Sequence, residues 1–432
     1  MRLPFLTRIT AMAGHNTYLT TTNLRRVQWG EGRRPALWCW TRPHPLRQMR
    51  AMSLDARYPA LSDLKARAQR RLPRFVWEYL DSGTGSEQAR RAGPDALQQI
   101  ALMPSILHGE MTPDLGTTLL GQSHPLPFGI GPVGMSGLIW PDAERHLARA
   151  AAVAGIPYTL STVAAQTPED IGPLAGNHAW FQLYPPRDEA IRLDMLARAR
   201  AAGFKVLVLT VDVPVASRRE RQTRSGLTQP PRLTPRLMAQ VAGCPAWAMG
   251  MARLGLPRMR LIDSYAGDTS GLPSTAHAGY LLRTSPDRAY LDWLRAHWDG
   301  PLVVKGVLDP ADVPMLEAAG VDAIWISNHG GRQFDGAPAT VRQLPLMRRA
   351  TDLPLIFDGG VTGGLDILRA LALGADFVMM ARPWHYALAA LGPDGPAHLV
   401  RILAADMSSN MGQLGARRLG DLPGRLIGAP AT

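Results

Sequence analysis

Residues 302–327 read LVVKGVLDPADVPMLEAAGVDAIWIS, two short apolar runs on either side of one helix-like segment. The runs Leu302–Lys305 and Ala323–Ser327 show no polar alternation, which is typical of parallel strands buried on both faces. The segment between them, Pro310–Ala319, stops before Gly320, a residue type that commonly ends a helix. The stretch therefore predicts one strand–helix–strand unit of a parallel sheet.

The same unit recurs along the chain at intervals of about 22–30 residues. Further strands are predicted at 128–131, 158–161, 180–184, 206–211, 355–358 and 377–380. Helix-like stretches lie between strands at 142–154, 187–201, 341–350 and 364–373. Eight strands that alternate with helices predict an α/β protein with a closed (β/α)8 TIM barrel. We expect this barrel domain at 53–425, with a helical extension at its N-terminal end.

Two segments do not follow this alternation of strands and helices. Residues 1–51 contain nine Arg and one acid without sustained periodicity, so we expect 1–52 to be a disordered leader or an extension from an upstream start codon, with a transit peptide as the alternative. Residues 222–285 form a basic insertion after the fourth strand, expected as a long loop. This insertion would either lie on an anionic membrane surface or act as a lid or subunit contact.

Composition excludes several classes of protein. The net charge is +12, but the positive charge is concentrated in the leader and the insertion, which disfavours nucleic-acid binding. Two cysteines cannot form a disulfide framework or a Cys-rich zinc site, and no HExxH motif or carboxylate cluster indicates a metal. No apolar run reaches the ~18 residues that span a bilayer. We expect a cytoplasmic protein, with peripheral contact to the inner face of the cell membrane left open.

Polar side chains follow the predicted strands at the end where a barrel carries its active site. Their burial without partners would be costly, so together they indicate a site. Gly359 and Gly360, with Arg382, suit a phosphate, while His329 and Arg332 suit a base beside a carboxylate. A phosphate-bearing cofactor and an anionic substrate are therefore predicted. The strand-end set comprises Gln182, Tyr184, Thr210, Asp212, Arg219, Lys305, Ser327, His329, Arg332, Asp358 and Arg382.

The block SNHGGRQFDG at 327–336 resembles the signature of the FMN-dependent α-hydroxy-acid dehydrogenases and oxidases. Further similar segments are WFQLY at 180–184, LTVDVP at 209–214, VKG at 304–306, DGG at 358–360 and ALALGAD at 370–376. The resemblance extends over residues 55–425 apart from the insertion. It implies FMN as the cofactor and the oxidation of an L-2-hydroxy acid to its 2-keto acid.

The resemblance also implies roles for single residues. His329 would be the catalytic base, Asp212 would stabilise its imidazolium, and Lys305 would lie beside N1 and O2 of the flavin. The substrate carboxylate would bind Tyr79, Arg219 and Arg332, and Tyr184 would contact the substrate near its hydroxyl. The implied cofactor-binding residues are Pro132, Val133, Gly134, Ser161, Gln182, Thr210, Lys305, Ser327, Asp358, Gly359, Gly360 and Arg382.

Some positions depart from the family pattern. Thr362 stands where the family usually has an arginine for the FMN phosphate, and Val133 stands where a threonine is common. Gly134 resembles the mandelate dehydrogenases, and Val163 leaves room for a large substrate side chain. We therefore expect (S)-mandelate or another bulky 2-hydroxy acid as the substrate.

The position of the insertion resembles that of the anchoring segment in the membrane-linked members of the family. It implies a membrane quinone as the electron acceptor, and the family suggests a homotetramer. One alternative is a soluble oxidase that acts on L-lactate or another 2-hydroxy acid and uses oxygen. A second is a catalytically silent barrel that serves as a scaffold. The joint presence of Lys305, His329 and Arg332 argues against the silent barrel.

Overall fold

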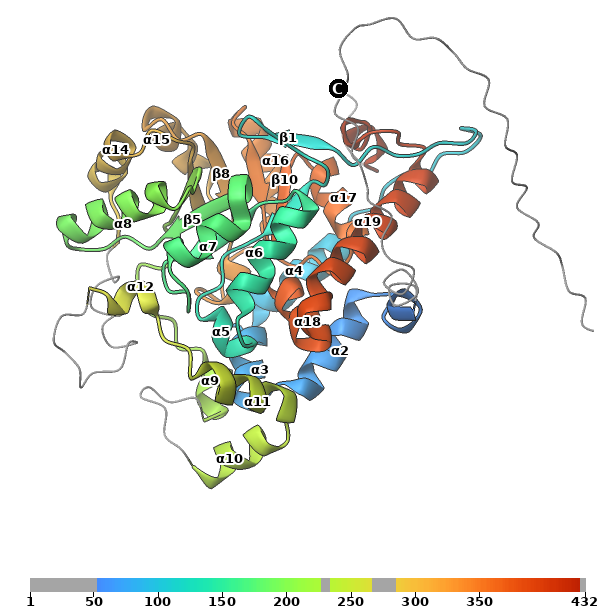
Figure 1. Ribbon diagram of the computed structural model, residues 1–432. Coiled ribbons are helices and arrows are strands. Elements are labelled where there is room, and N and C mark those ends of the chain that lie inside the picture. The colour runs from blue at the N-terminus through green and yellow to red at the C-terminus, as the bar shows by residue number, and fades with distance from the viewer. Residues whose placement is uncertain (1–52, 227–233, 266–284, 428–432) are drawn as a thin grey trace, which may run out of the picture. The chain divides into compact units, whose positions relative to one another are not determined.

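The computed structural model describes residues 53–226, 234–265 and 285–427, so the predicted leader lies outside the described part (Figure 1). Eight parallel strands close into a barrel, because β10 pairs with both β9 and β3, and the predicted TIM barrel is confirmed. In barrel order the strands are β3 (Phe128–Ile130), β4 (Tyr158–Ser161), β5 (Ala179–Leu183), β6 (Val206–Thr210), β7 (Leu302–Val307), β8 (Ala323–Ile326), β9 (Leu355–Phe357) and β10 (Phe377–Met380).

Helices alternate with these strands. They are α5 (Ser136–Ile139), α6 (Ala143–Ala154), α7 (Pro168–Ala175), α8 (Glu189–Ala201), α14 (Arg288–His297), α15 (Val313–Ala318), α16 (Thr340–Ala350), α17 (Gly364–Ala372), α18 (Arg382–Leu391) and α19 (Gly395–Leu414). The helix predicted at 310–319 is shorter than expected: a 3-10 turn occupies Pro310–Asp312, and α15 begins only at Val313. Pro314 explains this start, because proline is accommodated in the first turn of a helix.

The barrel interior is a packed core. The antiparallel hairpin of β1 (Thr117–Leu119) and β2 (Gln122–His124) contributes Leu119 to the cluster that fills it. Large buried side chains in that cluster include Trp180, Trp325, Phe377 and Met379. A filled interior leaves the carboxyl ends of the strands as the place for a site.

The predicted N-terminal extension contains helices α2 (Leu61–Arg71), α3 (Arg74–Asp81) and α4 (Gln88–Gln98), and residues 53–57 are also helical. Helix α2 is tied to α18, because Arg67 and Arg71 each donate to a carbonyl near its end, at Ala390 and Ala389. Thr84, between α3 and α4, donates its N–H to the Gly331 carbonyl at 3.0 Å. The extension therefore reaches the tip of β8.

The insertion is largely helical in its described part, whereas its sequence predicted a loop. Its described part contains α9 (Glu220–Arg224), α10 (Pro235–Ala242), α11 (Pro245–Leu254) and α12 (Arg260–Asp263). Two prolines of the segment occupy first helical turns: Pro235 follows the N-cap Thr234, and Pro245 begins α11. The Trp247 indole donates to the Leu138 carbonyl at 2.9 Å, which packs α11 on the barrel mouth. Among the described helices, none is long and apolar enough to cross a bilayer.

Candidate active site

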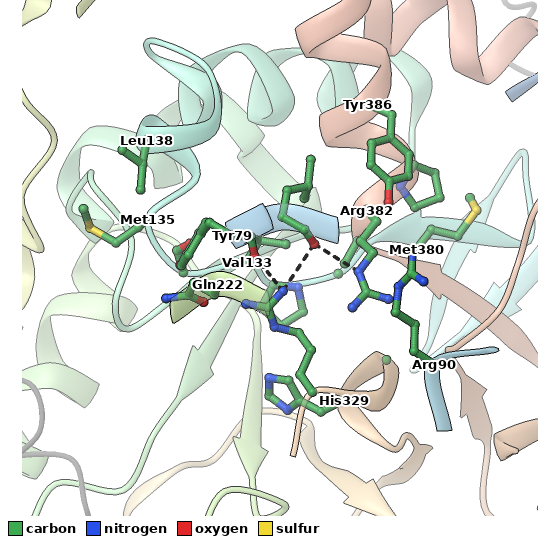
Figure 2. Close-up of a pocket in the computed structure, with 18 of the residues that line it drawn as sticks. Tyr79, Arg90, Val133, Met135, Leu138, Gln222, His329, Met380, Arg382 and Tyr386 are labelled. Atoms are coloured by element: carbon green, nitrogen blue, oxygen red, sulfur yellow. Dashed lines mark hydrogen bonds between the residues drawn. The ribbon is translucent and has the colours of Figure 1, made fainter. Parts of the chain in front are cut away.

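A cavity of about 1280 Å³ lies at the carboxyl ends of the strands (Figure 2). Its walls come from the strand tips, α3, the start of α4, and the insertion helices α10 and α11. Fourteen of the predicted site residues line it: Tyr79, Pro132, Val133, Gly134, Tyr184, Thr210, Arg219, Lys305, His329, Arg332, Asp358, Gly359, Gly360 and Arg382. Of the remaining four, Asp212 and Ser327 hydrogen-bond to the lining residues His329 and Lys305. Ser161 accepts from the N–H of Val163, which lines the cavity, at 3.4 Å, and Gln182 lies behind Ser161.

His329 and Asp212 form a hydrogen-bonded pair, with Nδ1 of the imidazole 2.9 Å from Oδ1 of the carboxylate. Burial lowers the pKa of His329, against the opposing effect of Asp212. Burial acts to raise the pKa of Asp212, but His329 and Lys305 hold it below its ordinary value. A neutral imidazole therefore faces an ionised carboxylate. Because an ionised Asp212 requires the proton on Nδ1, Nε2 of His329 is left as a proton acceptor.

Lys305 is a buried cation with its partners in place. Only 4% of the residue is exposed, and Nζ donates to Ser327 Oγ at 2.8 Å. The Asp358 carboxylate lies 3.3 Å from Nζ and accepts from the Trp325 indole at 2.9 Å. Ion pairing and hydrogen bonding of this kind offset the cost of burying an ammonium group.

The C-terminal end of α3 holds two arginines. Nη1 of Arg332 donates to the Tyr79 carbonyl at 2.8 Å, and Nη2 of Arg382 donates to the Ser82 carbonyl at 2.9 Å. Both guanidinium groups thus lie at the negative end of the helix dipole. Neither makes an ion pair within residues 53–226, 234–265 and 285–427. Burial, with Arg219 and Arg382, lowers the pKa of Arg332 to about 9, so the group stays charged at neutral pH and lacks an anion.

The other predicted substrate ligands converge on the same side of the cavity. The Tyr79 hydroxyl donates to the Gly134 carbonyl at 2.8 Å, and Arg219 Nε donates to Ser217 Oγ at 3.0 Å. Burial raises the pKa of Tyr184, which keeps its hydroxyl protonated. Arg219, Met135 and His329 all have left-handed backbone, with φ of +46°, +51° and +56°. Non-glycine residues in this conformation are strained, and such strain clusters at functional sites.

Unpartnered polar atoms allow a test of whether FMN fits. Within the described residues, Gln182 Nε2, Thr210 Oγ1 and Asp358 Oδ1 are buried and have no hydrogen-bond partner. Ser161 orients Gln182 by donating to its Oε1 at 2.9 Å. These atoms suit the polar edge of a flavin ring and the hydroxyls of a ribityl chain, and Arg382 suits the phosphate. The residues present therefore fit FMN.

Sequence reasoning missed several lining residues. Trp247 and Met251 come from the insertion, and Gln222 from α9 has a buried Oε1 without a partner in the described chain. Figure 2 places Gln222 near Tyr79 and Val133. The alternation of strands and helices that predicts the barrel does not extend to the helices of the insertion. The only sequence feature that could have indicated their role is Trp247, a large aromatic residue in a basic segment. Arg90, in the first turn of α4, also lines the cavity, and no motif in the sequence around it indicated a role in the site.

Comparison with known proteins agrees with this geometry. Residues 68–428 match the family described as FMN-dependent dehydrogenase. The chain is 40% identical over 369 residues to an L-lactate dehydrogenase of Stenotrophomonas maltophilia, covering 84% of this chain and 97% of the relative. An L-lactate dehydrogenase of Pseudomonas aeruginosa is 38% identical over 369 residues, with 84% and 96% covered.

Solved structures are also similar. The monotopic membrane protein (S)-mandelate dehydrogenase superposes with a TM-score of 0.82 at 32% identity, covering 86% of this chain and 99% of that one. A mandelate oxidase superposes with a TM-score of 0.72 at 32% identity, covering 86% and 98%.

Proposed function

The chain belongs to the FMN-dependent dehydrogenase family, and on that premise we propose that it oxidises (S)-mandelate or a similarly bulky 2-hydroxy acid and passes the electrons to a membrane quinone. That it is an FMN-dependent 2-hydroxy-acid oxidoreductase follows from the family. The observation that carries the proposal is the His329–Asp212 pair in one cavity with Arg332.

Residues of the chain bind the substrate, transfer a proton and hold the cofactor. Arg332 and Arg219 hold the substrate carboxylate, because guanidinium groups bind carboxylates with charge-assisted hydrogen bonds. Nε2 of His329 receives a proton from the substrate, and Asp212 stabilises the imidazolium that forms. FMN, when bound, accepts the two electrons of the oxidation. Lys305, Gln182, Thr210 and Arg382 would hold the cofactor.

The apolar wall of the cavity supports a bulky substrate. Val133, Gly134 and Leu138 line it from the barrel side, and Trp247 and Met251 line it from the insertion. A Cβ at position 134 would lie 2.6 Å from Val163 Cγ2, so glycine preserves the space there. L-lactate is the second candidate, because the L-lactate dehydrogenases share more identity with the chain than the mandelate enzymes do.

Rates of anaerobic flavin bleaching by (S)-mandelate, (R)-mandelate, L-lactate and glycolate test the substrate. We expect the highest kcat/KM with (S)-mandelate. A higher value with L-lactate would favour the second candidate, and a preference for glycolate would overturn the proposal of a bulky substrate.

A membrane acceptor is supported by the outer surface of the insertion. Met249 and Leu254 of α11 are exposed outside the cavity lining, the latter at 65%, and Arg236 and Arg253 lie exposed on α10 and α11. Exposed apolar groups beside cations suit an anionic membrane surface. The same helices line the cavity, so one segment would contact both the lipid and the site. The neighbour at TM-score 0.82 is a monotopic membrane protein, which is consistent with this arrangement.

Sedimentation with anionic lipid vesicles tests the membrane contact. Wild type should bind, and M249E/L254E, which changes no cavity-lining residue, should bind at least tenfold more weakly, because each buried apolar side chain contributes about 1.5–3 kcal/mol. V153E, at an exposed position of α6, is the matched control and should bind as wild type does. Equal binding by all three proteins, or faster turnover with oxygen than with a soluble quinone, would support the oxygen-using oxidase instead.

A further inference from the structure

Arg90 and Arg382 form an unexplained pair of like charges at the cavity. Figure 2 shows the two side chains next to each other below Tyr386. Both residues line the cavity, and the Arg90 side chain is only 19% exposed. Burial lowers the pKa of Arg382, and the charge of Arg90 lowers it further. Two neighbouring cations that are largely shielded from solvent are unfavourable unless an anion lies between or beside them.

The carboxylates nearby do not balance these cations. Three of them, Glu78, Asp81 and Glu87, make ion pairs with four cations, Lys65, Arg74, Arg90 and Arg221. Arg332 and Arg382 add two further cations that have no acidic partner in the described chain. The cluster therefore carries a surplus of positive charge on the side that faces the cavity.

Arg90 has hydrogen-bonding capacity to spare. Its Nη2 donates to Asp81 Oδ2 at 2.7 Å, and its Nη1 lies 3.5 Å from Glu87 Oε2. The described residues accept no other hydrogen bond from its guanidinium group. The two carboxylates thus fix the side chain at the cavity wall without using all its donors.

The glycine backbone after β9 lies close to α4. Gly359 and Gly360 have φ of +108° and +84°, and a Cβ on Gly93 of α4 would lie 3.2 Å from the Gly360 Cα. The middle of α4 therefore lies against the tip of β9, and Arg90 precedes this contact by one turn. At that tip Thr362 supplies no cation, and its hydroxyl donates to Asp366 at 2.6 Å.

We propose that Arg90 is a phosphate-binding residue for FMN, acting with Arg382 and positioned by Asp81 and Glu87. The inference rests on the proposed function, because it takes the glycine-rich end of the cavity as the phosphate end. An FMN phosphate carries about −1.5 to −2 charges at neutral pH, which would neutralise the surplus. A cation on α4 thereby replaces the one that Thr362 does not supply.

Affinity for FMN compared with riboflavin, which lacks the phosphate, tests this assignment. The full chain freed of its flavin is titrated with each ligand by fluorescence. Arg90→Gln should raise the Kd for FMN about tenfold or more, as loss of a charge-assisted contact implies, and leave the Kd for riboflavin unchanged. Arg74→Gln is the matched control: it removes a cation of the same cluster away from the cavity and should change neither Kd.

Arg90→Lys controls for a loss of folding, because it retains a positive charge beside Asp81 but lacks the planar guanidinium group. It should bind FMN with an affinity between those of wild type and Arg90→Gln. Equal weakening of FMN and riboflavin, or no weakening of either, would overturn the role of Arg90. If wild type itself bound neither flavin, the proposed function would fail, and that result is distinct from the first two.

Discussion

The reactivity of the site depends on one hydrogen bond between side chains that are far apart in sequence. Asp212 accepts from Nδ1 of His329, which fixes the imidazole as a proton acceptor at Nε2. The left-handed backbone of His329, with φ +56°, turns this side chain into the cavity at the tip of β8. Sequence reasoning identified both residues, but not the strained backbone that aims the ring.

The pH dependence of kcat/KM follows from the state of His329. Burial lowers the pKa of this imidazole below its ordinary value of about 6.5, and only the neutral form accepts a proton. The rate should therefore be flat above neutral pH and fall as pH drops through that lowered pKa. Asp212→Asn removes a carboxylate that raises the pKa, so its acid limb should lie at lower pH. If kcat/KM of the wild type already fell with decreasing pH above pH 7, the account would be contradicted.

Gly134 determines how much space the substrate side chain has. Gly134→Ala places a Cβ 2.6 Å from Val163 Cγ2, and a β-branched valine cannot move easily. Overpacking costs about 1–3 kcal/mol, so we expect kcat/KM for (S)-mandelate to fall about tenfold, with a smaller effect on L-lactate. Adding Val163→Ala should recover most of the loss. An equal fall for both substrates would mean that the glycine serves stability rather than specificity.

At the scale of elements, helices outside the barrel complete the site. The end of α3 holds Arg332 and Arg382 through its carbonyls, and Arg221 joins α9 to α3 by donating to Asp81 at 2.7 Å. The insertion was predicted as a loop because it makes the interval between the fourth and fifth strands much longer than one barrel unit. Pro235 and Pro245 begin helices in it, and sequence alone could not show that these helices pack on α3 and α5.

The ion cluster around Asp81 should make a large contribution to stability. Burial acts to raise the pKa of Asp81, but Arg90, Arg221 and Lys65 hold it well below its ordinary value. Asp81→Asn removes the buried carboxylate that Arg90, Arg221 and Lys65 share, and should cost about 1.5–3 kcal/mol of unfolding free energy at pH 7. Because the folded pKa is depressed, this stabilisation begins to fall as pH drops below about 4 and is lost fully only below the folded pKa, so the difference between the two proteins should shrink across that range.

Denaturant unfolding at pH 7 and at lower pH measures this difference. Asp352→Asn, at an exposed position of the same chain, should match wild type at each pH. A constant difference between Asp81→Asn and wild type at every pH would show that the lost stability comes from packing and not from charge.

At the scale of the whole molecule, barrel topology explains why strand ends far apart in sequence meet. Closure between β10 and β3 brings the tip of every strand to one mouth, so the eight apolar runs were enough to predict the barrel and the side on which its site lies. Lining residues that come from the strand tips were predictable for the same reason. Arg90, Gln222 and Trp247 were not, because helix packing places them and follows no periodicity.

The most direct test of the central claim is the rate at which (S)-mandelate bleaches the visible flavin absorbance under anaerobic conditions. The measurement compares wild type with His329→Asn, each loaded with FMN. Loss of a general base should slow bleaching about 10²- to 10⁴-fold while the flavin spectrum and FMN affinity are retained. Equal rates in the two proteins, or a wild type that no 2-hydroxy acid bleaches, would contradict the account.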